Sequence, residues 1–177
     1  MTSNRLPRVR ITVAPRHDEQ NTSSRDVRSL LRHDAEYHGI PSACEVRNSS
    51  SGAPFLTHSS QQVSLTHDLH WMAAATSPVP IGIDIQQQTR VTDRFRRRLG
   101  CGTVREATRS WSVREAISKL RARGLADAPW RYRIDAPRNE IGTFEEAHWQ
   151  CVRVGFDVFL AVAAECPVEL VLRGATP

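Results

Sequence analysis

Alternating hydrophobic and polar positions predict a strand near the middle of the chain. In "PIGIDIQQQ", residues 80–88, three isoleucines alternate with Gly82, Asp84 and Gln86. A period of two is typical of a half-buried β-strand, so the isoleucines share one face and the other three residues share the opposite face. Aspartate is depleted in strands, so Asp84 needs an explanation. It would lie either at a solvent-facing edge or below a metal or phosphate-bearing ligand that approaches over Gly82.

Further apolar runs predict more strands, at residues 8–14, 61–66, 70–76, 131–142, 147–155 and 156–164. The second and third are separated by a turn at His67, the fourth contains a turn at Pro137, and the last two form a closing hairpin. Residues 15–26 and 47–54 are polar and indicate loops.

Two segments have helical spacing. Residues 24–39 predict a helix that ends at Gly39. Residues 103–124 predict a second helix with Gly124 as its C-cap. Capping-box patterns begin at both Thr103 and Ser112, and the apolar spacing favours a start near Thr103 with a break at Ser112. From that start Trp111, Glu115 and Lys119 would lie along one side of the helix.

The size and composition fit a globular protein. The chain has 177 residues, enough for one domain or two small halves, with 40% hydrophobic and 24% charged residues. It contains no apolar run as long as a membrane span and no signal-peptide pattern at its N-terminus. Its four cysteines lack zinc or CxxC spacing, so we expect reduced thiols in a cytoplasmic protein.

The charge balance favours an anionic partner. The net charge is +5, and the densest basic run is "RFRRRLG", residues 94–100. The run lacks the interleaved aromatic residues of a base-stacking platform, and no nucleic-acid-binding motif accompanies it. Nucleic-acid binding is therefore the least favoured function for this basic chain.

Lys119 is the only lysine among 24 basic residues. This position is either an accident of an arginine-rich composition or a place that needs what arginine lacks. Lysine is a compact point charge whose pKa can fall far enough for proton transfer. Glu115 and Lys119 would otherwise be an ordinary exposed i,i+4 pair.

The strand and the second helix together supply hard oxygen ligands. Asp84 and Gln86 come from the strand, and Glu115 comes from the helix that also carries Lys119. Two carboxylates and an amide oxygen suit Mg²⁺, which prefers carboxylates combined with substrate phosphates and water. A lysine one turn beyond could act on the phosphate or on a proton.

These segments resemble the 4′-phosphopantetheinyl transferase family. "IGIDIQ" is similar to the family's G-(V/I)-D-(I/V)-E strand, and "WSVREAISK" is similar to its W-(S/T/A)-x-(K/R)-E-(A/S)-x-x-K helix. "GAPFL" (52–56), "VSLTHDLHWMAAATS" (63–77) and "GFDVFLAVAA" (155–164) resemble further family segments in the expected order.

The resemblance implies roles for individual residues. Asp84, Glu115 and Gln86 would ligate Mg²⁺, with Mn²⁺ as an alternative, and Lys119 would contact a phosphate and assist proton transfer. The substrate coenzyme A would meet the remaining segments: Thr66 and His67 at a phosphate, and Gly52 and Pro54 at the adenine. An N-terminal arginine would bind a further phosphate, for which the candidates are Arg16, Arg25 and Arg28.

The resemblance also implies a fold and partners. The fold would be α+β, with two similar αβ halves that contain small antiparallel sheets and are related by a pseudo-twofold axis. Residues 1–78 would form the N-terminal half and residues 79–177 the C-terminal half. The protein would be a monomer that modifies an acidic acyl or peptidyl carrier protein docked near Arg94–Arg98. The product would serve polyketide, nonribosomal peptide or fatty acid biosynthesis.

Two departures from the family pattern keep a second hypothesis open. Gln86 stands where many members have glutamate, and Ala53 replaces the lysine of a G-K-P turn. The alternative is a degenerate member that binds coenzyme A or a carrier domain without catalysing transfer.

Overall fold

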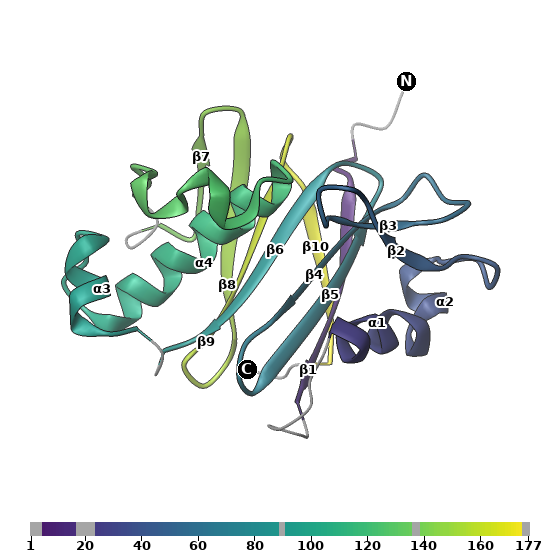
Figure 1. The fold of residues 1–177 in the computed structure, drawn as a ribbon, viewed down its shortest axis with the longest axis horizontal. Helices are drawn as coiled ribbons and strands as arrows, with labels where there is room; N and C mark the ends of the chain where they lie inside the picture. The colour runs from purple at the N-terminus through teal and green to yellow at the C-terminus, as the bar shows by residue number, and fades with distance from the viewer. Residues whose placement is uncertain (1–4, 17–23, 89–90, 136–138, 175–177) are drawn as a thin grey trace.

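The computed structural model describes residues 5–16, 24–88, 91–135 and 139–174. It has an α+β fold, which confirms the class expected from the sequence (Figure 1). No helix in the described ranges has the length and apolar character needed to cross a membrane.

Two four-stranded sheets form the centre of the molecule. The first contains β1 (Arg8–Pro15), β4 (Gln62–His67), β5 (Trp71–Ser77) and β10 (Glu169–Arg173), in the order β10-β1-β5-β4. The second contains β6 (Ile81–Gln87), β7 (Ile141–Phe144), β8 (Ala147–Gly155) and β9 (Val158–Ala164), in the order β6-β9-β8-β7. All pairs of these described strands are antiparallel except β1 with β10.

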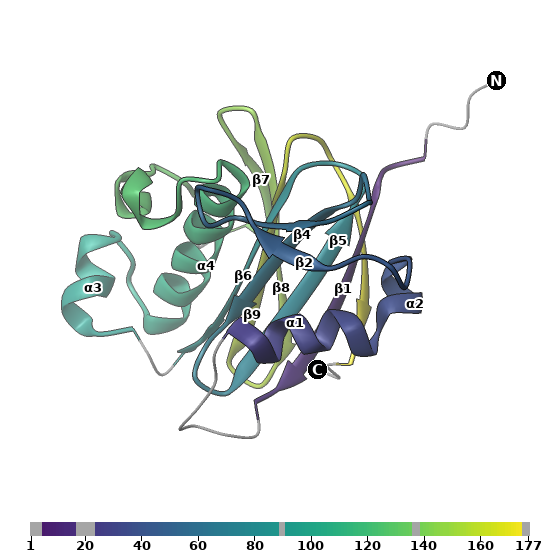
Figure 2. The same ribbon diagram turned by 45° about the vertical axis from the view of Figure 1, so that its right-hand side comes forward.

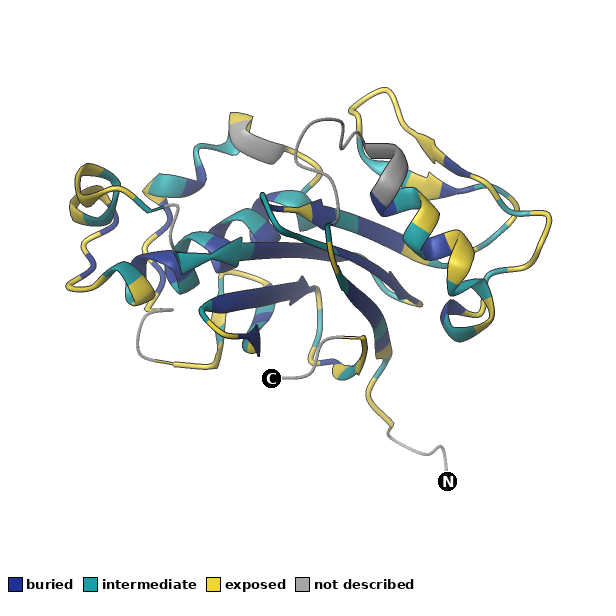
Figure 3. Cartoon of the chain, turned by 90° about the horizontal axis from the view of Figure 1, so that it is seen from below, coloured by how far each residue is buried: buried dark blue, intermediate teal, exposed yellow. Residues whose placement is uncertain are grey.

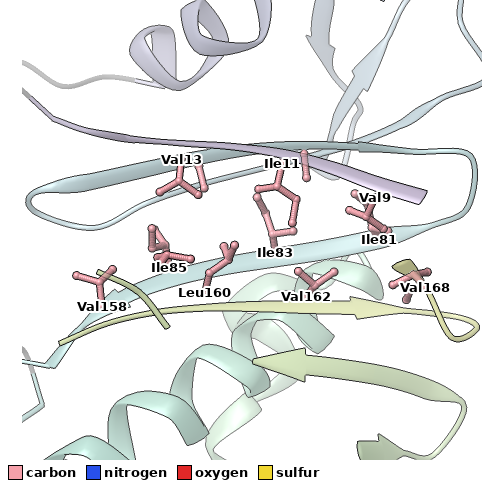
Figure 4. Close-up of a cluster of buried hydrophobic side chains, with 14 residues drawn as sticks. Val9, Ile11, Val13, Ile81, Ile83, Ile85, Val158, Leu160, Val162 and Val168 are labelled. Carbon is pink, nitrogen blue, oxygen red and sulfur yellow. The ribbon is translucent and has the colours of Figure 1, made fainter. Parts of the chain in front are cut away.

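The two sheets pack face to face over an aliphatic core. Figure 4 shows the side chains of β1 meeting those of β6 and β9. The isoleucines of β6 belong to this core, and two of them, Ile83 and Ile85, are fully buried. The period-two pattern therefore identified the correct inward face of β6.

Helices cover the outer face of each sheet. On the first sheet lie α1 (Ser24–His33) and α2 (Ala35–His38), and on the second lies α4 (Val104–Leu120) (Figure 2). In Figure 3 the strands are largely buried and α1 carries exposed residues, whereas most residues of α4 are buried or intermediate. The two sheets also share a pairing pattern. The first strand of each sheet pairs with the second strand of a later hairpin, β1 with β5 and β6 with β9.

The remaining elements are short. The hairpin strands β2 (Val46–Asn48) and β3 (Pro54–Leu56) form a two-stranded sheet, where the sequence indicated only a loop. The helix α3 (Asp93–Arg98) holds the basic run, and 3₁₀ turns occupy Gly124–Asp127 (η2) and Pro129–Arg131 (η3).

Several predicted boundaries need correction. The helix α4 begins after Thr103, whose capping box is complete, and continues through Ser112 without a break. It ends at Leu120 with Arg121 as the C-cap, so the prediction of Gly124 was wrong. No strand covers residues 131–135, and β7 begins only at Ile141; the predicted turn at Pro137 lies outside the described residues.

Other predictions were confirmed. The predicted helix over residues 24–39 does end at Gly39, which caps α2 in the left-handed conformation with φ of 64°, but a turn at Asp34 divides it into α1 and α2. The closing hairpin is β8 and β9. Cys44, Cys101, Cys151 and Cys166 are all free thiols. The C-terminal strand β10, which the sequence pattern did not reveal, pairs with β1 and so joins residues 169–173 to the sheet formed mainly by residues 1–78.

Candidate functional site

The candidate site lies where the edges of the two sheets meet. β4 is an edge strand of the first sheet and β6 is an edge strand of the second. The backbone N–H of Ile83 donates to Ser64 Oγ at 3.0 Å, and that of Ile85 donates to Thr66 Oγ1 at 3.3 Å. The two hydroxyl oxygens thus accept hydrogen bonds from backbone N–H groups at the edge of β6, which have no neighbouring strand to pair with.

The helix α4 packs closely against β6 because Gly82 has no side chain. A Cβ atom at this position would lie 2.0 Å from the carbonyl oxygen of Ala116 and 2.4 Å from the backbone nitrogen of Leu120. The hypothesis that a ligand approaches over Gly82 was therefore wrong, because the backbone of α4 occupies that space. The close approach brings the Glu115 and Lys119 side of the helix toward Asp84.

Asp84 is buried, with 1% of its surface exposed, so the solvent-facing explanation was also wrong. Its Oδ1 accepts hydrogen bonds from Lys119 Nζ at 2.7 Å and from Thr66 Oγ1 at 3.0 Å, and its Oδ2 accepts from Gln86 Nε2 at 3.0 Å. A buried carboxylate is costly unless charge and hydrogen bonds compensate it, and here both do.

Lys119 uses all three of its N–H donors. Besides Asp84, its Nζ donates to Thr66 Oγ1 and to the carbonyl oxygen of Ile83, each at 3.1 Å. The three contacts match the three donors of an ammonium group. Three elements, β4, β6 and α4, are joined by this one nitrogen.

Glu115 lies next to the same carboxylate. Burial raises the pKa of Glu115 above its ordinary value, and the neighbouring Asp84 raises it further, while Lys119 opposes both effects. Two carboxylates that share a site cannot both ionise freely unless a cation compensates them. Glu115 is therefore the carboxyl group of this cluster that most readily holds a proton.

His67 and Arg16 lie beside the cluster. His67 is the last residue of β4, and its surface is largely exposed. Burial of part of the imidazole lowers the pKa of His67, and the positive charges of Arg16 and Lys119 lower it further. Arg16 donates to the carbonyl oxygen of Asp68, and its Nε is buried without a hydrogen-bond partner among the described residues. Arg16 and Lys119 therefore supply positive charge at this edge of the site, and the lowered pKa favours a neutral His67 beside them.

The structure distinguishes among the three arginines that were candidates for binding a phosphate of coenzyme A. Arg16 lies near His67, whereas Arg28 donates from Nη2 to Asn48 Oδ1 at 2.7 Å and so lies against β2. The side chain of Arg25 lies outside the described residues. Of the two described candidates, Arg16 is the one next to the Asp84 cluster.

A cavity of about 250 Å³ connects Lys119 with the β2–β3 hairpin. Its lining includes Gly52, Ala53 and Pro54 on one side and Lys119 and Leu120 at the end of α4 on the other. The structure therefore brings the "GAPFL" turn and Lys119 to one cavity, although they are far apart in the sequence. Gly52 has a φ of 84° and open space where a Cβ would lie.

Two supporting residues were not predicted. Ser112 is buried in α4 and donates from Oγ to the carbonyl oxygen of Asp84 at 2.9 Å. Asp68 is buried in the β4–β5 turn, where Oδ1 accepts from the backbone of Leu69 and Oδ2 from that of Gln87, both at 2.7 Å. The only indication of these two residues in the sequence was that they lie in the same segments as the predicted site residues.

The basic run occupies a different place. Arg94–Arg98 lie in α3, where Thr92 caps the helix and Phe95 packs edge-to-face on Trp111 of α4 at 4.8 Å between ring centroids. Arg96 donates from Nη1 to the carbonyl oxygens of Cys101 and Gly102, so part of the run holds the α3–α4 connection.

The donor chemistry of the cluster suits a hard divalent cation, which would relieve the repulsion between Asp84 and Glu115. Gln86 presents its amide nitrogen to Asp84, so an oxygen from Gln86 would reach a shared cation only after the amide turns. Within the described ranges no group of three His, Cys, Asp or Glu side chains is placed to hold a metal ion. Amide, substrate or water oxygens would have to complete the coordination.

A scan of the chain against models of protein families gives no match, and a search among curated proteins gives none either.

Proposed function

We propose that this protein transfers the 4′-phosphopantetheine arm of coenzyme A to a serine of an apo acyl or peptidyl carrier protein, within the two-halved fold of the 4′-phosphopantetheinyl transferases. The observation that carries the proposal is the junction of β4, β6 and α4. There Asp84, Glu115 and Lys119 converge beside a cavity that Gly52 and Pro54 also line.

Coenzyme A would bind across the junction of the two sheets. The adenine would lie against Gly52 and Pro54, where the missing side chain of glycine leaves room for a flat ring. Lys119, His67 and Arg16 would face the phosphates. Binding between two packed halves would hold the pyrophosphate in one orientation for attack.

In the reaction, the serine oxygen of the carrier forms a bond to the β-phosphorus of coenzyme A. The bond from that phosphorus to the bridging oxygen breaks, and 3′,5′-ADP leaves with the electron pair. The serine proton passes to Glu115 in its ionised form, which a cation held by Asp84 and Glu115 would favour, because the three contacts of Lys119 Nζ already use its donors. Lys119 instead stabilises negative charge on the phosphate.

Asp84 and Glu115 would hold Mg²⁺ or Mn²⁺, with Gln86 as a third oxygen ligand. When bound, the cation supplies the positive charge that neutralises the pyrophosphate. The carrier would dock through its acidic surface near Arg94–Arg98, and the complementary charge would mainly increase the rate of encounter.

The second candidate function is binding of coenzyme A or a carrier without transfer. It is favoured by the closed hydrogen-bonding of Asp84, whose two oxygens are engaged by Lys119, Thr66 and Gln86. A site in which Lys119 replaces the metal would still bind an anion but would lack the charge needed for transfer.

The test is the mass of an apo carrier protein after incubation with coenzyme A, Mg²⁺ and this protein. We expect a gain of one phosphopantetheine arm on the carrier serine. A carrier in which that serine is replaced by alanine serves as the control. Binding of coenzyme A with no mass gain on any of a panel of carriers would support the non-catalytic function instead.

A further inference from the structure

A ladder of side-chain oxygens joins the edge strands β4 and β6, which lie side by side where the two sheets meet (Figure 1). At every second position, an oxygen from β4 or from the turn after it accepts a hydrogen bond from a backbone N–H of β6. The three pairs are Ser64 with Ile83, Thr66 with Ile85, and Asp68 with Gln87, at 3.0, 3.3 and 2.7 Å. Each pair is 19 positions apart in the sequence, so the two edges run in the same direction and stay aligned. The ladder therefore fixes one sheet against the other at the edge of the site.

The hydroxyl of Thr66 extends this ladder into the candidate site. Besides accepting from the backbone N–H of Ile85, its Oγ1 accepts from Lys119 Nζ at 3.1 Å and donates to Asp84 Oδ1 at 3.0 Å. A hydroxyl group has one donor and two acceptor lone pairs. These three contacts therefore use the full hydrogen-bonding capacity of Thr66.

A phosphate would find no free group on Thr66. Only 4% of the residue is exposed. Phosphate oxygens accept hydrogen bonds, so a phosphate would need the one hydroxyl proton, which Asp84 already receives. Losing that hydrogen bond would be costly for a buried carboxylate. The next residue, His67, is exposed and is the better placed of the two for the phosphate contact that the family resemblance implies for both.

We propose that Thr66 is a positioning residue, which transmits the alignment of the two sheets to the charged groups of the site. In the proposed transfer reaction, on which this role rests, Lys119 stabilises negative charge on the phosphate and Asp84 would hold the cation. Both effects depend on where the two groups lie. One hydroxyl on β4 aligns the carboxylate of β6 with the ammonium of α4.

The composition of the chain allows a direct measurement, because Lys119 is its only lysine. Protein labelled with ¹⁵N-lysine gives one side-chain ammonium signal by NMR. Thr66→Val removes the hydroxyl, so we expect this signal to shift and its protons to exchange faster with water. Thr66→Ser keeps the hydroxyl, so the signal should stay near its wild-type position.

Thr76→Val is the matched control. Thr76 is another buried threonine of the first sheet, and its hydroxyl hydrogen-bonds to His38 rather than to a group of the site. The control loses an equivalent hydroxyl, so it should lower stability without moving the Lys119 signal. An unchanged signal in Thr66→Val, or an equal shift in Thr76→Val, would overturn the positioning role.

Kinetics and coenzyme A binding separate positioning from direct contact. We expect Thr66→Val to lower kcat about tenfold or more, the usual effect of losing a hydrogen bond to a charged group, and Thr66→Ser to restore the rate. In the Lys119→Ala background, Thr66→Val should cause no further loss of coenzyme A affinity, measured by calorimetry in EDTA. A further loss of about tenfold in the double variant would make Thr66 a phosphate contact instead.

A reciprocal measurement applies if Thr66→Val does not fold. Lys119→Ala should shift the ¹³C-methyl signal of Thr66 and the amide signal of Ile85 without any ligand, because the three groups meet at one hydroxyl. Absence of both shifts would overturn the role of Thr66. The NMR measurements involve neither coenzyme A nor a carrier protein, so failure here and failure of the proposed function are distinguishable.

Discussion

At the scale of single residues, the buried carboxylate of Asp84 organises the site. Aspartate is unfavourable inside a strand, and this one is compensated by an ammonium, a hydroxyl and an amide from three different positions. The solitary lysine of the chain is the group that supplies the charge. Its compact ammonium fits among three acceptors, which a planar guanidinium cannot contact through one nitrogen.

The first prediction concerns Lys119. Both Lys119→Ala and Lys119→Arg should lower the transfer rate by about 10²–10³-fold, the usual effect of losing one donor to developing charge. Arginine keeps the charge but cannot reproduce the three contacts of Nζ. Steady-state kinetics of transfer to a carrier protein would measure the loss.

The pH–rate profile separates a purely electrostatic role of Lys119 from proton transfer. If the lysine acts only through its charge, residual activity in both variants should keep the wild-type profile. Loss of one limb of the profile would show that Lys119 carries the proton, as the sequence suggested. An arginine variant within a few-fold of wild type would contradict proton transfer by Lys119 and the need for its three contacts, and would leave only the role of its charge.

The second prediction concerns Gln86→Glu. In the wild type, Gln86 Nε2 donates a hydrogen bond to Asp84 Oδ2. Glutamate at this position would lose that hydrogen bond and, in the absence of a cation, its carboxylate would repel Asp84. With a cation bound, the added charge should tighten binding. We therefore expect a lower half-saturating Mg²⁺ concentration for activity together with a lower melting temperature in chelator. An unchanged Mg²⁺ dependence would show that Gln86 is not a ligand.

At the scale of elements, the contact between β6 and α4 creates the site. Gly82 allows the helix to pack with its backbone against the strand, and the same contact places Glu115 and Lys119 over Asp84. The capping box at Thr103 fixes where α4 begins, and Ser112 ties its middle to the Asp84 carbonyl.

The third prediction is that Gly82→Ala destabilises the protein by about 3 kcal/mol or more, because overpacking against backbone cannot be relieved by a rotamer change. Urea unfolding would measure it. Gly155→Ala is the matched control, since a Cβ there would meet Trp71 only at 3.5 Å, an ordinary contact. Equal stability of the two variants would contradict the close packing of α4 on β6.

A second element contact depends on His38, which is fully buried between α2 and the first sheet. Its Nε2 lies 3.0 Å from Thr12 Oγ1 on β1, and its Nδ1 lies 3.0 Å from Thr76 Oγ1 on β5. Burial lowers the pKa of His38 to about 4; Asp34 opposes this effect, and Arg10 and Arg173 add to it.

The fourth prediction follows from this shift. The unfolded chain binds a proton on His38 near pH 6.5, whereas the folded protein binds it only near pH 4. The contribution of the neutral His38 to the free energy of unfolding is therefore complete above pH 6.5 and is lost as the pH falls to 4. The loss is about 3 kcal/mol, at 1.4 kcal/mol per pKa unit. Denaturant unfolding of the wild type between pH 7 and 4 would measure it.

His38→Gln is the comparison that isolates this group, because glutamine can hydrogen-bond but does not titrate in this range. The variant should be less stable at pH 7 but should lose less stability on acidification. Parallel pH dependences for the two proteins would assign the acid sensitivity to other groups.

At the scale of the whole molecule, the core and the candidate site are separate. The core lies between the inner faces of the two sheets, whereas the site lies at their adjoining edges and under α4 (Figures 1 and 4). Aliphatic burial at the core stabilises the fold without any cation.

The fifth prediction uses this separation. Excess EDTA should abolish transfer while leaving the melting temperature within about 2 °C of its value in Mg²⁺, because a weakly held cation adds little to a fold with its own core. Calorimetry and the carrier mass assay would be run on the same samples. Full transfer in EDTA would eliminate the metal from the proposal.

Several local elements could be predicted from the sequence alone. The alternation in β6, the closing hairpin and the capping box of α4 are read from neighbours in the chain, because period and caps depend on residues only a few positions apart. The residue types near Asp84 were also identified, and the structure brings Asp84, Gln86, Glu115 and Lys119 together.

Which element covers each face of a strand or helix is visible only in the folded molecule. A period-two pattern shows that Gly82 and Asp84 share a face but not that a helix lies on it, and the contact of Asp84 with Lys119 spans 35 positions in the chain. The pairing of β10 with β1 likewise joins segments that meet only after folding. Periodicity records how a residue is oriented on its own element, whereas burial, charge compensation and cavities depend on which other element packs against it.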